Sequence, residues 1–133
     1  MSDLPCVCVS LRRASRKLTA LYDDALAPAG INVAQFSLLR NIERHGALSL
    51  TRLGEIVALD RSTLGRNAKV LERLGLVRLV DSRDRREATL SLTEEGERTL
   101  SAGVIRWEDA QAQIHRKIGA DGAAQLQALL GAL

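Results

Sequence analysis

The spacing of apolar residues predicts a mostly helical chain that begins with a long amphipathic helix. Beyond Pro5, which we expect in the first helical turn, apolar residues recur at alternating spacings of four and three. This narrow seam, of the kind that packs along another helix, consists of Val7, Leu11, Ala14, Leu18, Leu21 and Ala25. Pro28 and Gly30 are expected to end the helix in a turn.

Capping residues then divide the pattern into three shorter helices. Asn32 and Gln35 have the spacing of a capping box, Ser49 and Asp60 are expected to cap the next two helices, and Gly75 is expected to stop the third. The first of the three should end near His45 and Gly46. The inward positions are predicted to be Phe36, Leu39, Ile42, Leu50, Leu53, Ile56, Val57, Leu64, Ala68, Leu71 and Leu74.

The period then changes from helical to two. Residues 76–80 and 88–92 read as strands, joined by the polar loop 81–87, which carries three arginines. Thr93 is expected to cap another long helix, interrupted at 119–122 and followed by a short last one. Its seam is predicted to be Leu100, Val104, Trp107, Ile114 and Ile118, and the last helix presents Leu126, Leu129, Leu130 and Leu133.

This order predicts a mainly helical fold with a small antiparallel β wing, a winged helix-turn-helix flanked by long terminal helices. The two terminal seams favour a homodimer built from both ends of the chain, because the central helices already offer apolar faces to one another. The alternative is that the seams fold back on the chain's own core.

Composition narrows the class of protein. The 133 residues are enough for one domain, and with 46% apolar but only 2% aromatic residues its core must be aliphatic. No run approaches the ~20 apolar residues of a membrane span and no secretory leader is evident, so we expect a cytoplasmic protein without a membrane partner. Residues 49–92 contain nine Lys/Arg and six Asp/Glu, whereas the rest contains ten of each. The excess positive charge thus lies where a polyanion would bind.

The helix after Asp60 has the side chains of a DNA-reading helix. Its unpacked positions hold hydroxyls, an amide and cations, and all of these can contact phosphates or base edges in the major groove. They are Arg61, Ser62, Thr63, Arg66, Asn67 and Lys69. An ordinary amphipathic helix with a polar exterior is the alternative.

The loop favours the DNA-binding interpretation. It lacks the glycine of a tight hairpin turn and holds Arg83, Arg85 and Arg86, and arginine is suited to the negative potential of the minor groove. Asp84 would repel phosphate, so we expect it to orient Arg86 through a bidentate ion pair.

The chain resembles the MarR family of bacterial transcription regulators. The resemblance rests on residues 59–64 (LDRSTL), 71–77 (LERLGLV), 81–86 (DSRDRR) and 90–96 (LSLTEEG). It implies a single domain over 1–133, in which 1–30 and 97–133 form the dimer and 31–96 form the DNA-binding lobe. It also implies binding to pseudo-palindromic double-stranded operators, usually as a repressor, with Arg86 in the minor groove and Asp84 as its orienting partner.

Cys6 and Cys8 are the candidate sensor residues. Near a helix N-terminus the dipole lowers a thiol pKa, and Arg12 lies one turn beyond Cys8. The segment around Cys8 also resembles the organic-hydroperoxide-sensing branch of the MarR family, with Tyr22 at one of that branch's tyrosine positions. The other two tyrosine positions hold Arg12 and Val33. Alternatively, both cysteines are small apolar residues in a dimer interface and the inducer is a small apolar or phenolic ligand. A Cys6–Cys8 disulfide is not expected if both lie on the helix.

Other classes of function have less support. The sequence contains no nucleophile–base–acid set, phosphate-binding glycine loop or metal-ligand spacing, so we expect neither an enzyme nor a cofactor or metal site. A non-specific nucleoid protein would explain the basic segment but not the polar helix face.

Overall fold

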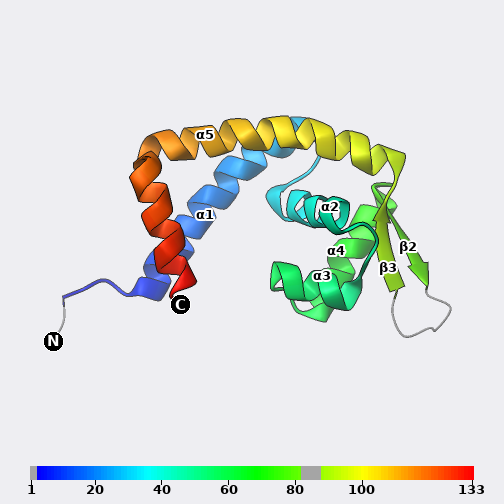
Figure 1. Ribbon diagram of the computed structural model, residues 1–133, viewed down its shortest axis with the longest axis horizontal. Coiled ribbons are helices and arrows are strands. Elements are labelled where there is room, and N and C mark those ends of the chain that lie inside the picture. Colours follow the sequence, from blue (N-terminus) through cyan, green and yellow to red (C-terminus); the bar gives the residue numbers. More distant parts are fainter. Residues whose placement is uncertain (1–2, 82–87) are drawn as a thin grey trace.

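The computed structural model describes residues 3–81 and 88–133, and it divides into a lobe and a frame (Figure 1). The winged-helix lobe comprises α2 (Val33–His45), β1 (Leu48–Ser49), α3 (Leu50–Val57), α4 (Arg61–Arg73), β2 (Val77–Asp81) and β3 (Ala88–Leu92). The terminal frame comprises α1 (Val7–Leu26) and α5 (Glu94–Gly131), and a 3-10 turn, η1 (Ala27–Ala29), follows α1. The expected mainly helical fold with a small β wing is confirmed.

Local capping chemistry sets most helix boundaries where the sequence predicts them. Asn32 and Gln35 form a complete capping box at the start of α2, and the side chains of Ser49, Asp60 and Thr93 accept backbone N–H groups at the starts of α3, α4 and α5. Gly75, with φ 77°, follows α4 as its stop.

The sheet contains a strand that the pattern did not predict. Within the described residues its order is β1-β3-β2, and β1 pairs Leu48 with Leu90 and Ser49 with Thr89. A strand of two residues is too short to show a period of two, and its pairing depends on β3, about forty residues further on. The other two strands pair in antiparallel register from Val77↔Leu92 to Asp81↔Ala88.

The core lies inside the lobe and under the first half of α5. Its buried residues include Phe36, Leu39, Ile42, Leu53, Leu64, Ala68, Leu71, Leu90 and Leu100, most of which were expected to point inward. Gly103 lets α5 cross close to the lobe, since a Cβ there would lie 3.3 Å from atoms of both Ile31 and Phe36. Trp107 stacks on Phe36 with ring centroids 5.7 Å apart.

Two expectations about local structure were wrong. Leu74, expected to face the core, is 50% exposed because it is the C-cap of α4, where the helix is already ending. Pro5 lies outside α1, which begins at Val7 after an N-cap at Cys6.

The terminal helices keep much of their apolar surface exposed. On α1, Val7, Val9, Leu11 and Leu18 are exposed, and α5 bends at Gly119 so that its last part, residues 120–131, runs beside α1 (Figure 1). We call this last part the C-terminal arm. Its Leu126, Leu129 and Leu130 are also exposed. The α5 seam packs on the core at Leu100, Val104 and Trp107, whereas the C-terminal arm and the first half of the α1 seam keep their apolar side chains exposed.

Candidate nucleic-acid interface

Helices α3 and α4 are joined by a tight turn that holds them as a helix-turn-helix. Ala58 adopts a left-handed backbone with φ 55°, and Leu59 N–H donates to the Gly54 carbonyl at 3.1 Å. A Cβ on Gly54 would lie 3.2 Å from the Leu59 carbonyl and 3.3 Å from a Leu64 methyl, so this close approach favours glycine. The turn therefore sets the angle at which α4 leaves α3.

Helix α4 is anchored on one side and open on the other. Leu64, Ala68 and Leu71 are buried in the core. Four of the six side chains predicted to meet DNA are exposed and two are half-buried: Arg61, Ser62, Arg66 and Lys69, then Thr63 and Asn67. This face combines positive charge with amide and hydroxyl groups that can pair with base edges or phosphates.

Asp60 organises the first turn of that face. Its carboxylate accepts the Thr63 backbone N–H and the Ser62 hydroxyl, each at 2.8 Å, and the Thr63 hydroxyl at 3.0 Å. These bonds, chiefly that from the Thr63 backbone, lower the pKa of Asp60 from 3.8 to about 2. Arg66 in turn donates to the Thr63 hydroxyl oxygen at 3.3 Å.

This arrangement has a chemical consequence that the residue pattern did not predict. Because the Ser62 and Thr63 hydroxyls donate their protons to Asp60, their oxygens act as acceptors, and that of Thr63 already accepts Arg66. An acceptor suits the amino group of cytosine or adenine better than a phosphate. The sequence does contain a sign of this arrangement, because Asp60 at the N-cap is followed two and three residues later by Ser62 and Thr63.

The wing is described only up to the base of its loop. Asp81 pairs with Ala88, so the ladder between β2 and β3 continues to the edge of residues 82–87. The predicted DNA-contacting residues Arg83, Asp84, Arg85 and Arg86 lie outside the described residues.

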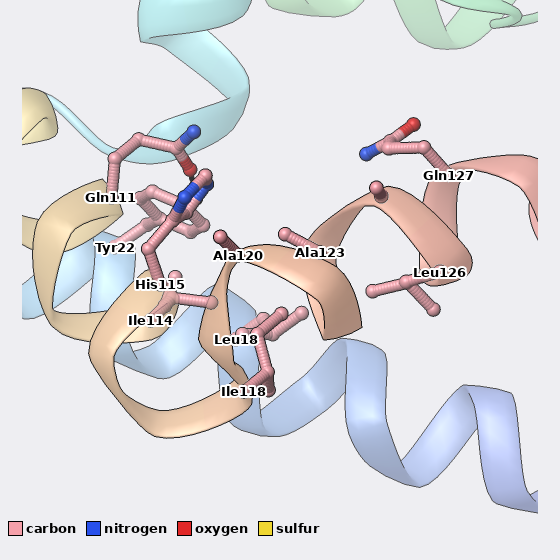
Figure 2. Close-up of a pocket in the computed structure, with 11 residues that line it drawn as sticks. Leu18, Tyr22, Gln111, Ile114, His115, Ile118, Ala120, Ala123, Leu126 and Gln127 are labelled. Carbon is pink, nitrogen blue, oxygen red and sulfur yellow. Dashed lines mark hydrogen bonds between the residues drawn. The ribbon is translucent and has the colours of Figure 1, made fainter.

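A hollow lies within the frame, between α1 and the two parts of α5 (Figure 2). It has a volume of about 440 Å³, and its lining includes Leu18, Ile114, Ile118 and Leu126. The Tyr22 hydroxyl donates to Gln111 Oε1 at this hollow, which ties α1 to α5. Burial raises the pKa of Tyr22 above its ordinary value.

The structure places the candidate sensor cysteines at the start of α1 and Tyr22 elsewhere. Both thiols are free and exposed, with Cys6 as the N-cap and Cys8 in the first turn. Cys6 has an extended backbone with ψ 120° and lies outside the helix. The argument against a Cys6–Cys8 disulfide assumed that both residues are helical, so it does not apply to this structure. Arg12 is exposed and lies one turn beyond Cys8. Tyr22 lies about 21 Å from Cys8 along the helix axis. Within one protomer, Tyr22 therefore does not contact Cys8.

The described ranges contain neither a metal-binding cluster nor a membrane-spanning helix. Residues 3–81 and 88–133 contain no group of three or more His, Cys, Asp or Glu side chains arranged to hold a metal ion. Within the same ranges, no helix has both the length and the apolar character that a bilayer crossing requires.

Comparisons with known proteins agree with this architecture. The MarR family profile matches residues 29–87. The organic hydroperoxide resistance transcriptional regulator of Bacillus subtilis is 33% identical over 91 residues, which span 68% of this chain and 62% of that protein. The M. tuberculosis transcriptional regulator MosR, solved in complex with DNA, has a TM-score of 0.85 and 34% identity over 96% of this chain and 94% of MosR.

A likeness at lower identity bears on the fold alone. A mutant MarR from E. coli, complexed with operator DNA, has a TM-score of 0.86 at 22% identity over 94% of this chain and 91% of that one. The fold and the comparisons together define a winged helix-turn-helix transcriptional regulator. The chain belongs to the MarR family, whose members are regulators and not enzymes.

Proposed function

We propose that this protein is a homodimeric repressor that binds pseudo-palindromic operators in double-stranded DNA. The proposal is based mainly on the outward face of α4. This face carries cations, hydroxyls and an amide, while Leu64, Ala68 and Leu71 on the opposite face are buried in the core. In this proposal residues 31–96 bind DNA, and residues 1–30 and 97–133 form the dimer. MosR, 34% identical and solved in complex with DNA, supports it.

The dimer in this proposal uses the exposed seams of the frame. Pairing two copies through α1 and α5 would cover Leu11 and Leu18 together with the apolar residues of the C-terminal arm. It would also place two α4 helices about 34–36 Å apart, which is the spacing of half-sites one helical turn apart.

Arg66 and Asn67 are proposed to read bases, while Arg61 and Lys69 contact phosphates. The test is selection of binding sites from random DNA, followed by fluorescence anisotropy with the selected operator and its single-base variants. Asn67→Ala should lose about 1–3 kcal/mol of discrimination at one position. Lys69→Ala should weaken binding to all sequences similarly and reduce the salt dependence. Equal behaviour of the two variants would contradict the assignment.

The wing is proposed to insert Arg86 into the minor groove, with Asp84 orienting its guanidinium. Arg86→Ala should weaken operator binding strongly while leaving the thermal unfolding curve unchanged. Lys117→Ala, on the exposed surface of α5, is the charge-matched control. Unchanged affinity of the Arg86 variant in a gel-shift titration would remove the wing from the proposal.

Oxidation of Cys8 is the proposed signal for release from DNA. The thiol is exposed at the positive end of α1, and a relative with 33% identity is an organic hydroperoxide resistance regulator. Peroxide should release the wild-type protein from its operator, and Cys8→Ser should abolish the response. Cys6→Ser tests whether the second thiol resolves the oxidised form. A Cys8→Ser protein that still responds to peroxide would exclude Cys8 as the sensor.

The second candidate signal is a small apolar or phenolic ligand. Its support is the hollow beside Tyr22 and Gln111, together with an adjoining hollow of about 450 Å³ that also borders Leu18 and Leu126. Tyr22→Phe keeps the ring but removes the hydroxyl. If phenolic compounds release the wild type but not this variant, and Cys8→Ser responds normally, the ligand hypothesis replaces the redox hypothesis.

A further inference from the structure

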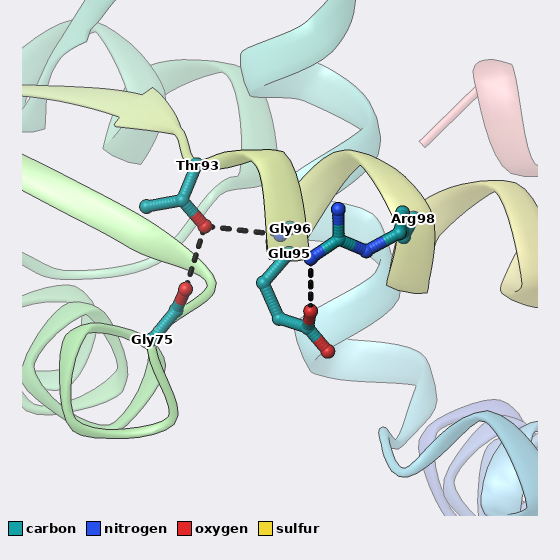
Figure 3. A network of polar contacts seen from close by, with 5 residues as sticks. All are labelled: Gly75, Thr93, Glu95, Gly96 and Arg98. Carbon is teal, nitrogen blue, oxygen red and sulfur yellow. Dashed lines mark hydrogen bonds and ion pairs between the residues drawn. The ribbon is translucent and has the colours of Figure 1, made fainter.

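The start of α5 is bonded directly to the segment that links α4 to the wing (Figure 3). The Thr93 hydroxyl donates to the Gly75 carbonyl at 2.6 Å, and the Thr93 backbone N–H donates to the Leu76 carbonyl at 3.1 Å. The same hydroxyl oxygen accepts the Gly96 N–H at 3.0 Å, which caps α5. A single side chain thus both caps the frame helix and binds the end of the α4 segment.

Gly96 brings the two segments into unusually close contact. A Cβ at this position would lie 2.0 Å from the Leu76 carbonyl oxygen and 3.0 Å from its carbon, both of them backbone atoms that cannot rotate away. Gly96 is buried and its φ lies in the helical range, so the close approach rather than the backbone angle explains the glycine. Any side chain there would push the first turn of α5 away from Leu76.

These contacts connect the segment after α4 to the first turn of α5. Gly75 and Leu76 lie between the C-cap of α4 and β2, while Thr93 follows β3 and caps α5. Each α4 helix in a dimer is positioned on DNA by its own α5. A small rotation at this junction would therefore shift both recognition helices and change the distance between them.

We infer that Thr93 is a positioning residue that sets the half-site spacing read by the dimer. The inference rests on the proposed operator-binding function. The hydroxyl of Thr93 keeps α4 and the wing at one angle to α5, and Gly96 permits the contact. Loss of this bond should broaden the range of operator spacings that the protein accepts, in addition to weakening its binding.

Two substitutions at Thr93 separate its two roles. Thr93→Asp keeps an N-cap acceptor for the Gly96 N–H but cannot donate to the Gly75 carbonyl. Thr93→Ser keeps both bonds and is the matched control. Gly96→Ala tests the same junction independently, because the added Cβ would meet the Leu76 backbone.

The experiment measures affinity for the selected operator and for versions with one base pair added or removed between the half-sites. Circular dichroism and light scattering establish that each variant is folded and dimeric. We expect Thr93→Asp to bind the selected operator about tenfold more weakly, in line with the loss of one hydrogen bond. The ratio of its affinity for the selected operator to its affinity for the altered spacings should fall at least about threefold, while Thr93→Ser should match the wild type.

The outcomes distinguish this inference from the proposed function. If Thr93→Asp and Gly96→Ala unfold at lower temperature but retain the wild-type spacing preference, the junction only stabilises the fold and the inference is wrong. If Thr93→Asp does not fold, the folded Gly96→Ala protein decides the question by the same spacing ratio. If the wild-type protein selects no DNA sequence, the proposed function fails first and the inference fails with it.

Discussion

The winged-helix lobe and the terminal frame bury their apolar residues to very different extents. The lobe packs α2, α3, α4 and the sheet around a continuous aliphatic core. The large apolar residues that remain exposed lie almost entirely in the frame and the segment before it; among the described residues, Leu74 and Val80 are the exceptions within the lobe. The lobe therefore surrounds a core that Leu26 and the first half of α5 complete, while the rest of the frame has the apolar surface expected of a partner interface.

In the proposed dimer, the two regions would perform different tasks. The packed core of the lobe would keep the α4 face in one shape, as base reading requires. The frame would determine how two such faces are placed relative to each other. Hydrogen bonds from Thr93 connect α5 to the lobe, and the Tyr22–Gln111 bond connects α5 to α1.

The largest effect is expected from the lobe core. Leu71→Ala removes a fully buried side chain and should lower the free energy of unfolding by about 2–5 kcal/mol. Leu74→Ala, three residues further on and 50% exposed, should cost about 1 kcal/mol or less. Denaturant unfolding monitored by circular dichroism measures both. Similar losses for the two leucines would contradict the buried-core description.

The frame is tested by charged substitutions in its exposed seams. Leu11→Glu combined with Leu129→Glu should convert the dimer to a monomer with a folded lobe, because two carboxylates would have to be desolvated at the interface. Operator affinity should then fall at least about 100-fold, since each half-site is bound singly. Light scattering and anisotropy provide the measurements, and Leu74→Glu is the control. A dimer that survives the double substitution would place the interface elsewhere.

A smaller effect is expected at the bend of α5. Gly119 has φ 76° and ψ 162°, a region that is essentially restricted to glycine. Gly119→Ala should therefore cost about 1–3 kcal/mol, although no atom lies within 4 Å of the new methyl group. Because the C-terminal arm would shift, the dimer dissociation constant should also rise. An unfolding curve identical to that of the wild type would contradict the prediction that the backbone at Gly119 requires glycine.

The smallest effect is a stabilisation of the lobe. Ala58 is exposed and, with φ 55°, is held in the left-handed region without a glycine. Ala58→Gly should relieve this strain and raise the free energy of unfolding by about 0.5–1 kcal/mol, after subtracting the entropy cost of glycine. Ala47→Gly is an exposed control outside the left-handed region and should not stabilise. A destabilised Ala58→Gly protein would contradict the strain argument.

The amino-acid sequence by itself determined the elements that depend on short-range interactions. The caps at Asn32, Ser49, Asp60 and Thr93 involve partners three residues away, so their spacing is visible along the chain. The outward face of α4 follows from the helical period, because Leu64, Ala68 and Leu71 must point to the core.

Only the tertiary structure decided features that join distant segments. Strand β1 exists because Leu48 pairs with Leu90, and the bond from Tyr22 to Gln111 joins residues 89 positions apart. The hydrogen bond from the Thr93 hydroxyl to the Gly75 carbonyl likewise joins residues 18 positions apart. The cap at Thr93 was predictable because its partner is local, whereas the second bond of the same hydroxyl requires the packed lobe to bring Gly75 within reach.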